Sequence, residues 1–69
     1  MDLIGVVKHG SCKFVKCRDD DFSKVLRSYG FISGVQIKVV SKNKHGLVVE
    51  VLGTKYSINL NMAKIIEVE

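Results

Sequence analysis

The stretch LRSYGFISGVQIKVV, residues 26–40, decides the fold of this 69-residue chain because two periodicities meet in it. Its first part completes a run in which apolar residues recur at positions i, i+3, i+4 and i+7, namely Phe22, Val25, Leu26 and Tyr29. That spacing predicts a short helix over about residues 21–29 that packs this stripe against the rest of the protein. Asp20 or Asp21 is expected to cap its first turn. The last part alternates apolar and polar residues, which predicts a half-buried strand over residues 35–39.

Two glycines, Gly30 and Gly34, join the predicted helix to the predicted strand. We expect Gly30 to end the helix in the left-handed conformation that favours glycine, and Gly34 to allow a sharp turn into the strand. The three residues between them cross from the helix to the sheet. Of the two apolar residues in this crossing, Phe31 and Ile32, one is expected to pack inward and the other to stay partly exposed.

Three more stretches have the composition or the alternation of strands. Residues 11–17, SCKFVKC, are rich in β-forming side chains, and residues 47–52 and 56–59 alternate as strands with one buried face do. Gly53 and Thr54 follow the second of these stretches. We expect them to form a two-residue type II′ hairpin, in which glycine takes the first central position because its φ must be positive.

The chain ends in a brief predicted turn at residues 61–63 and a last predicted strand, KIIEV, at residues 64–68. Five short strands in so small a chain cannot form a two-sheet sandwich, whereas closure into a barrel removes the exposed sheet edges. The predicted fold class is therefore mainly β: a small SH3-like five-stranded barrel with one short α-helix between the first two strands. No shift in composition marks a linker, so we expect a single domain over residues 1–69.

Composition and charge restrict the class of protein. A hydrophobic fraction of 46% without proline is typical of a folded globule and not of a disordered chain. The apolar run at residues 3–7 is far shorter than the about 20 residues that span a membrane, and Asp2 precedes it where a signal peptide has basic residues. We therefore expect a cytoplasmic protein with reduced cysteines. The net charge is +4, and its densest basic cluster, KNKHG at residues 42–46, is expected to be a solvated hairpin tip.

Four side chains could ligate a transition metal: His9, Cys12, Cys17 and His45. They are weak candidates, because ligand pairs in structural zinc sites lie about two to four residues apart, whereas the spacing here sends the two cysteines to opposite faces of a strand. The acidic run at residues 19–21 lacks the glycine and the distal glutamate of a calcium loop and is better explained as helix capping. We therefore predict no metal site and no cofactor.

The motifs of enzymes are missing from the sequence. It contains no glycine-rich phosphate loop and no serine in a nucleophile elbow, so we expect a binding module and not an enzyme. The sequence pI near 9.3 raises the alternative of a small barrel that binds nucleic acid. That alternative is disfavoured, because Tyr56 is expected to point inward and Tyr29 to lie on the packed helix face, which leaves few rings to stack on bases.

The pattern around the two glycines resembles the FeoA family, small accessory proteins of bacterial ferrous iron transport. In this pattern the end of a helix carries a leucine, followed after two residues by a large apolar residue and a glycine. After three more residues a second glycine leads into an alternating strand. The resemblance extends over nearly the whole chain at Leu26, Tyr29, Gly30, Phe31, Gly34, Ile37, Val49, Val51, Gly53, Ile58, Ala63, Ile66 and Val68. The chain departs from the family pattern at Ser33, where proline is usual, and at Tyr29, where leucine is usual.

The resemblance implies a protein that docks on the cytosolic part of the FeoB-type ferrous iron permease and supports iron uptake. The solvent-facing side of the helix and the crossing form the expected docking surface, which comprises Lys24, Arg27, Ser28, Phe31 and Ile32. The same SH3-like module occurs in iron-dependent repressors of the diphtheria toxin repressor type, whose helix-turn-helix and dimerisation segments are not present here. A stand-alone transition-metal-binding domain related to these repressors is the alternative.

Overall fold

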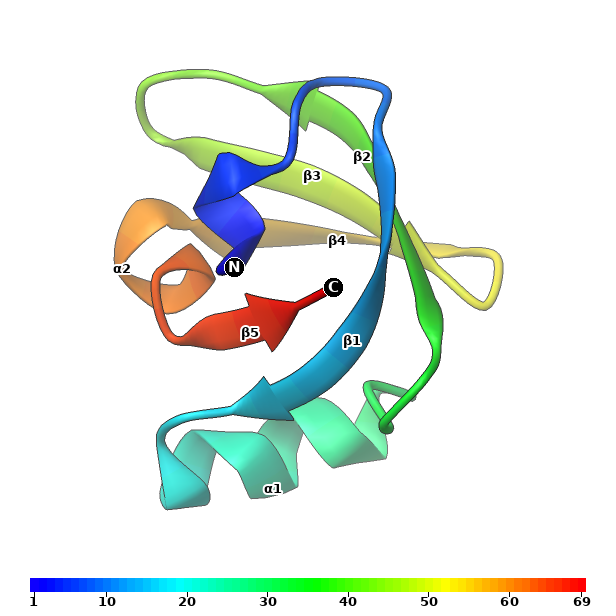
Figure 1. Ribbon diagram of the computed structural model, residues 1–69, viewed down its shortest axis with the longest axis vertical. Coiled ribbons are helices and arrows are strands. Elements are labelled where there is room, and N and C mark those ends of the chain that lie inside the picture. The colour runs from blue at the N-terminus through cyan, green and yellow to red at the C-terminus, as the bar shows by residue number, and fades with distance from the viewer.

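The computed structural model describes residues 1–69 and contains five strands, two α-helices and one 3₁₀ turn (Figure 1). Along the chain these elements are η1 (Leu3–Gly5), β1 (Ser11–Cys17), α1 (Asp20–Ser28), β2 (Gln36–Lys42), β3 (Gly46–Val51), β4 (Thr54–Asn59), α2 (Leu60–Ala63) and β5 (Ile66–Val68). The predicted order of strand, helix, three-strand meander, turn and strand is confirmed. Neither α-helix has the length and the apolar character that a membrane-spanning helix needs.

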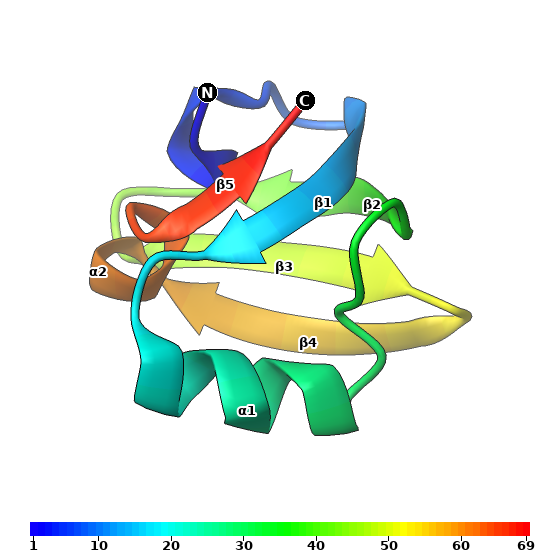
Figure 2. The same cartoon turned by 60° about the horizontal axis from the view of Figure 1, so that its bottom comes forward.

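The five strands form one antiparallel sheet in the order β4-β3-β2-β1-β5. The sheet is strongly curved, and α2 connects its two edge strands (Figures 1 and 2). No pairing joins β4 to β5, so the sheet does not show the closed barrel that we predicted. The last strand is also shorter than predicted, because residues 64 and 65 continue the turn after α2.

The concave side of the sheet holds a core of 16 buried residues, all of them apolar or cysteine. Ile37, Val39 and Val49 have no exposed surface, and they lie at alternate positions on adjacent strands. Because neighbouring side chains of a strand point to opposite faces, this alternation puts every second residue of β3, and of β2 as far as Val39, into the core. The β2–β3 register shifts between Val39 and Ser41, and the alternation in β2 ends there. The strand periodicity read from the sequence is therefore confirmed.

A break in register changes the expected placement of the cysteines. The pairing of β1 with β5 shifts between Phe14 and Lys16, which marks a β-bulge around Val15. The extra residue reverses the alternation, so Cys12 and Cys17 are both buried, with 7% and 6% of their surfaces exposed. The prediction that they point to opposite faces is wrong for this reason. Both thiols are free and pack in the core.

The joint after α1 has the geometry that its glycines predict. Gly30 has φ 96° and Gly34 has φ 92°, values that side chains with a Cβ rarely adopt. The N–H of Phe31 donates to the carbonyl of Leu26 and the N–H of Gly30 to that of Arg27, which is the Schellman pattern that closes a helix. At the other end the cap is Asp19, one residue before the predicted pair, and its carboxylate accepts from the N–H of Phe22 at 2.9 Å.

The hairpin between β3 and β4 differs from the prediction. Val51 pairs with Thr54, so its two central residues are Leu52 and Gly53 and not Gly53 and Thr54. Both have positive φ, 52° and 83°, which defines a type I′ turn in place of the predicted type II′ turn. Leu52 adopts a backbone conformation that is costly for a residue with a branched side chain, and 74% of its surface is exposed.

The basic cluster at the β2–β3 hairpin is not solvated throughout. Lys42 is partly buried, and its ammonium donates hydrogen bonds to the backbone carbonyls of Ile4 and Val6, the latter at 3.1 Å. Asn43 closes the tip, because its side-chain oxygen accepts from the N–H groups of His45 and Gly46. One lysine of the cluster therefore fastens the N-terminal segment to the sheet.

Candidate interaction surface

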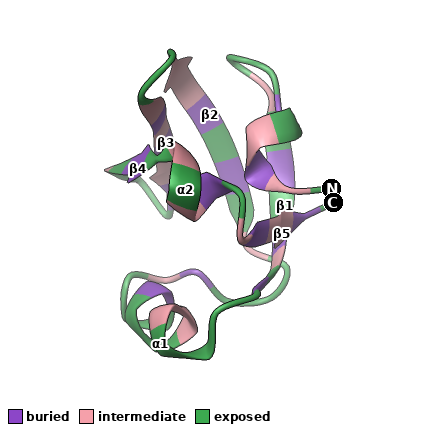
Figure 3. Ribbon diagram, turned by 90° about the vertical axis from the view of Figure 1, so that its left-hand side faces the viewer, coloured by how far each residue is buried: buried purple, intermediate pink, exposed green.

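The apolar stripe of α1 is not fully covered by the rest of the protein. Leu26 is buried and Phe22 is half-buried, but Val25 and Tyr29 have 45% and 51% of their surfaces exposed. Figure 3 shows α1 set apart from the sheet, with exposed residues around most of its circumference. The prediction that all four residues pack inward is therefore wrong for the outer two, although the periodicity of the helix is as predicted.

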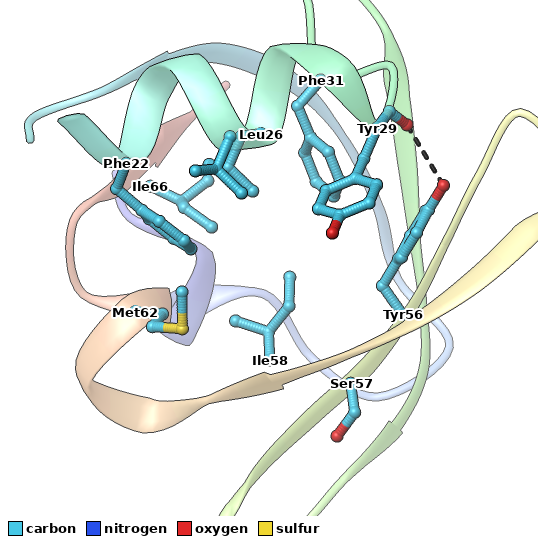
Figure 4. Close-up of a pocket in the computed structure, with 10 residues that line it drawn as sticks. Phe22, Leu26, Tyr29, Phe31, Tyr56, Ser57, Ile58, Met62 and Ile66 are labelled. Atoms are coloured by element: carbon cyan, nitrogen blue, oxygen red, sulfur yellow. Dashed lines mark hydrogen bonds between the residues drawn. The ribbon is translucent and has the colours of Figure 1, made fainter. Parts of the chain in front are cut away.

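The space under this stripe is a cleft of about 250 Å³ between α1, β4 and α2 (Figure 4). Nine of the ten residues that line it are hydrophobic: Phe22, Val25, Leu26, Tyr29, Phe31, Tyr56, Ser57, Ile58, Met62 and Ile66. It lies where the sheet stays open between its two edge strands. An apolar concave surface with a few polar groups at its border is the usual form of a binding site.

Three aromatic rings form one end of the cleft. The ring centroids of Tyr29 and Tyr56 lie 5.4 Å apart, and those of Phe31 and Tyr56 lie 5.7 Å apart. The hydroxyl of Tyr56 donates to the backbone carbonyl of Tyr29 at 3.2 Å, so β4 is linked directly to the end of α1 (Figure 4). Phe31 is 2% exposed and makes an edge-to-face contact with Phe14 of β1 at 5.8 Å. The C-terminal end of α1 is therefore anchored.

The residues predicted for docking lie on more than one side of α1. Lys24, Arg27 and Ser28 are exposed, and the hydroxyl of Ser28 donates to the carbonyl of Val25 in its own helix. Arg27 and Ile32 border a shallow groove on the β1 side of α1, away from the cleft. As expected for the crossing, one of its apolar residues is buried and the other, Ile32, is 54% exposed. The buried one is Phe31, which is 2% exposed because it packs in the core, so its place in the predicted docking surface is wrong.

Val25 and Tyr29 are the surface residues that sequence reasoning missed. Their spacing assigned them to the same stripe as Leu26, and a stripe that contacts the sheet has the same periodicity as one that stays partly open. The stripe was visible in the sequence, but its exposure depends on how closely α1 approaches β4. The rings of Phe31 and Tyr56 lie between the two at one end of the cleft, with their centroids 5.7 Å apart.

The metal candidates do not come together. No group of three or more His, Cys, Asp or Glu side chains is placed to hold a metal ion. Burial raises the pKa of the Cys12 thiol, which keeps it protonated and makes it a poorer ligand, because the thiolate is the metal-binding form. The absence of a tight metal site stays a prediction that titration can test.

The outer face of the sheet does not present a basic stripe. Lys38 pairs with Glu50, and Glu50 pairs in turn with Lys55, so opposite charges alternate across three strands. Arg18 forms an ion pair with Glu67 at 3.6 Å. Protein surfaces that bind nucleic acid gather positive charge along a groove or a helix. On this face of the sheet, carboxylates lie between the basic residues.

The curved antiparallel sheet, the single helix in the β1–β2 connection and the apolar cleft define a small β module that is open between its two edge strands. The FeoA domain matches residues 3–69 of the chain. The chain therefore belongs to the FeoA domain family. No curated protein matches it.

Solved structures of FeoA proteins have the same fold. FeoA of Stenotrophomonas maltophilia, described as an SH3 domain protein complexed with zinc, is 26% identical and has a TM-score of 0.89 over 100% of this chain and 89% of its own. An iron uptake regulatory protein (FeoA) is 20% identical, with a TM-score of 0.87 over 100% of this chain and 93% of its own. FeoA of Chlorobium tepidum is 18% identical, with a TM-score of 0.90 over 100% of this chain and 69% of its own. The predicted SH3-like class is thus confirmed.

Proposed function

We propose that this protein is a cytoplasmic accessory protein of ferrous iron transport that docks on the cytosolic part of the FeoB-type permease and supports iron uptake. The Stenotrophomonas relative is described as possibly acting as a ferrous iron transport activating factor, which supports the same role for this chain. The apolar cleft on its surface supports an action by binding.

One observation carries the proposal: apolar side chains remain exposed along α1 and the crossing. Val25, Tyr29 and Ile32 have between 45% and 54% of their surfaces exposed. Val25 lies on α1, Tyr29 caps its C-terminal end, and Ile32 lies in the crossing that follows. Figure 3 shows this helix standing apart from the sheet. An apolar group rimmed by polar residues is the usual composition of a protein interface, in which a few anchors supply most of the affinity.

Basic residues border these anchors and are expected to control the rate of encounter. Lys24 and Arg27 are exposed on α1, and neither forms an ion pair within the protein. Charges at the rim of an interface mainly change the association rate and its salt dependence. We therefore expect the permease surface that faces α1 to be acidic.

The experiment is a pull-down of the permease from membranes, combined with iron uptake, for the double variant Lys24→Glu, Arg27→Glu. We expect weaker capture and lower uptake, with the largest difference at low salt. A matched control is Lys8→Glu, Lys44→Glu, which makes the same change of charge at two exposed lysines outside α1. Equal losses in both variants would indicate a general effect of net charge, and unchanged binding in the first would exclude α1 as the docking helix.

A further inference from the structure

The two edges of the sheet are not equivalent. The edge at β5 is partly covered by the start of the chain, because Asp2 bridges to Glu67 and the N–H of Val68 donates to the carbonyl of Met1 at 2.7 Å. The edge at β4 pairs only with β3 and has no strand on its outer side. An uncovered edge strand presents unpaired N–H and C=O groups and is a template for another strand.

The register identifies which groups of β4 are free. Val51 and Thr54 close the two-residue hairpin as a hydrogen-bonded pair, and the bonded and non-bonded pairs then alternate along the two strands. Lys55 and Ser57 fall at the non-bonded positions, so their N–H and C=O groups point away from β3. Neither residue takes part in the backbone hydrogen bonds outside the regular ladders.

The free backbone groups of Ser57 border the apolar cleft. Ser57 is one of the residues that line it, although Figure 4 shows its side chain pointing away from the cleft, so its contribution comes from the backbone. Tyr56 and Ile58, on either side of it, point their side chains toward α1. A strand that added to this edge would bond to Lys55 and Ser57 and direct alternate side chains toward the cleft.

The two ends of the cleft carry opposite charges. Lys55 lies on β4 near the hairpin, is exposed and forms no ion pair. Asp20 and Asp21, also exposed, begin α1 next to Phe22, at the end of the cleft that Met62 closes. A segment antiparallel to β4 would therefore place its C-terminal end near Lys55 and its N-terminal end near the aspartates, so charge complementarity requires an acidic residue at its end and a basic one at its start.

We propose that the open edge of β4 takes up an extended segment of a partner protein as a sixth, antiparallel strand, with apolar residues at alternate positions between a basic start and an acidic end. This proposal rests on the proposed function only in so far as the surface binds a protein. Main-chain hydrogen bonds from the partner segment to Lys55 and Ser57 supply part of the affinity, and the cleft selects which side chains of that segment fit.

The test uses a blocked synthetic peptide of seven residues, in which valine and threonine alternate between an initial lysine and a final glutamate. We expect it to bind the wild-type protein, and to bind at least about tenfold more weakly to Ser57→Pro, which removes a main-chain donor and places a ring at the pairing edge. Proline is compatible with this position because its N–H is not used in the fold. Ser57→Ala keeps the N–H and is expected to bind like the wild type.

Methylation of the peptide amides tests strand pairing without altering the protein. Amides of an extended peptide alternate in direction, so methylation of one alternate set is expected to abolish binding, and methylation of the other set to change it by about twofold or less. This comparison decides the question even if Ser57→Pro does not fold. Equal effects of the two methylation patterns, or no binding of the unmodified peptide at about 1 mM, would overturn the proposal.

The charges of the peptide test its direction. A peptide with glutamate first and lysine last is expected to bind several-fold more weakly, and Lys55→Glu should remove or reverse that preference. A dimer of the free protein that is lost in Ser57→Pro would assign the edge to a second copy and overturn the proposal. If the permease is captured equally by the wild type and Ser57→Pro, the proposed strand addition fails while the proposed function stands. If the peptide binds but the permease is not captured, the proposed function fails while the proposed strand addition stands.

Discussion

The sheet and α1 are both amphipathic, but only the sheet has its apolar face covered. Ile37, Val39 and Val49 in the sheet have no exposed surface, whereas Val25 and Tyr29 in α1 are about half exposed. The difference is that β2 and β3 lie between other strands and face the core, whereas α1 is anchored at its C-terminal end and lies beside the open sheet edge at β4. Periodicity thus reports which face is apolar, and the neighbouring elements decide whether that face is buried.

The largest expected effect contrasts one residue from each region. Ile37→Ala should lower the free energy of unfolding by about 2–5 kcal/mol, because it removes buried groups and leaves a cavity. Val25→Ala should change it by about 0.5 kcal/mol or less, since the side chain is half exposed and alanine favours a helix. Urea unfolding of both variants measures the contrast. Similar losses would mean that the α1 stripe belongs to the core.

The next effect concerns the joint that connects the two regions. At Gly34 a Cβ would meet no atom within 4 Å, but φ is 92°, so a substitution is opposed by the backbone and not by packing. We expect Gly34→Val to cost about 1–2 kcal/mol and Gly34→Asn to cost less, because asparagine tolerates positive φ better. Thermal unfolding gives the order. An unchanged melting temperature for the valine variant would contradict this explanation.

A smaller effect of opposite sign is expected at the β3–β4 hairpin. Leu52→Asn should raise the free energy of unfolding by about 0.5–1 kcal/mol, because asparagine is favoured at the first central position of a type I′ turn. Leu52→Ala is the control, since it shortens the side chain without relieving the positive φ. A destabilised asparagine variant would show instead that the packing of the Leu52 side chain, whose Cδ1 lies 2.9 Å from where a Cβ on Gly30 would stand, outweighs the strain of the turn.

The sequence determines the sheet more completely than the surface. Alternation located β2, β3 and β4, and the two glycines located the joint, because both patterns depend on local geometry. The bounds were less exact, since β2 runs on to Lys42 and β4 begins at Thr54, beyond the predicted residues 35–39 and 56–59. The bulge at Val15 and the type I′ turn at Leu52 were missed, since a single extra residue or an unfavourable φ depends on how strands pair across the sheet. The cleft was missed for a similar reason: it requires the distance between α1 and β4, which no local pattern encodes.

The smallest expected signal is that of a metal at the cysteines. Titration with cobalt should give no intense thiolate absorption, because burial raises the pKa of Cys12 and the other candidate ligands are not gathered around it. Cys12→Ser and Cys17→Ser serve as controls for any weak signal. Strong absorption that either variant abolishes would contradict the prediction and favour a transition-metal-binding role.

The central claim is that the exposed stripe of α1 serves a partner and not the fold, and Val25→Lys tests it most directly. Calorimetric titration with the purified cytosolic part of the FeoB-type permease should show affinity weakened by at least about tenfold, with the melting temperature of the variant close to that of the wild type. Lys44→Ala, at an exposed position on the β2–β3 hairpin, should bind normally. Unchanged affinity of Val25→Lys, or a loss of stability as large as that of Ile37→Ala, would contradict the claim.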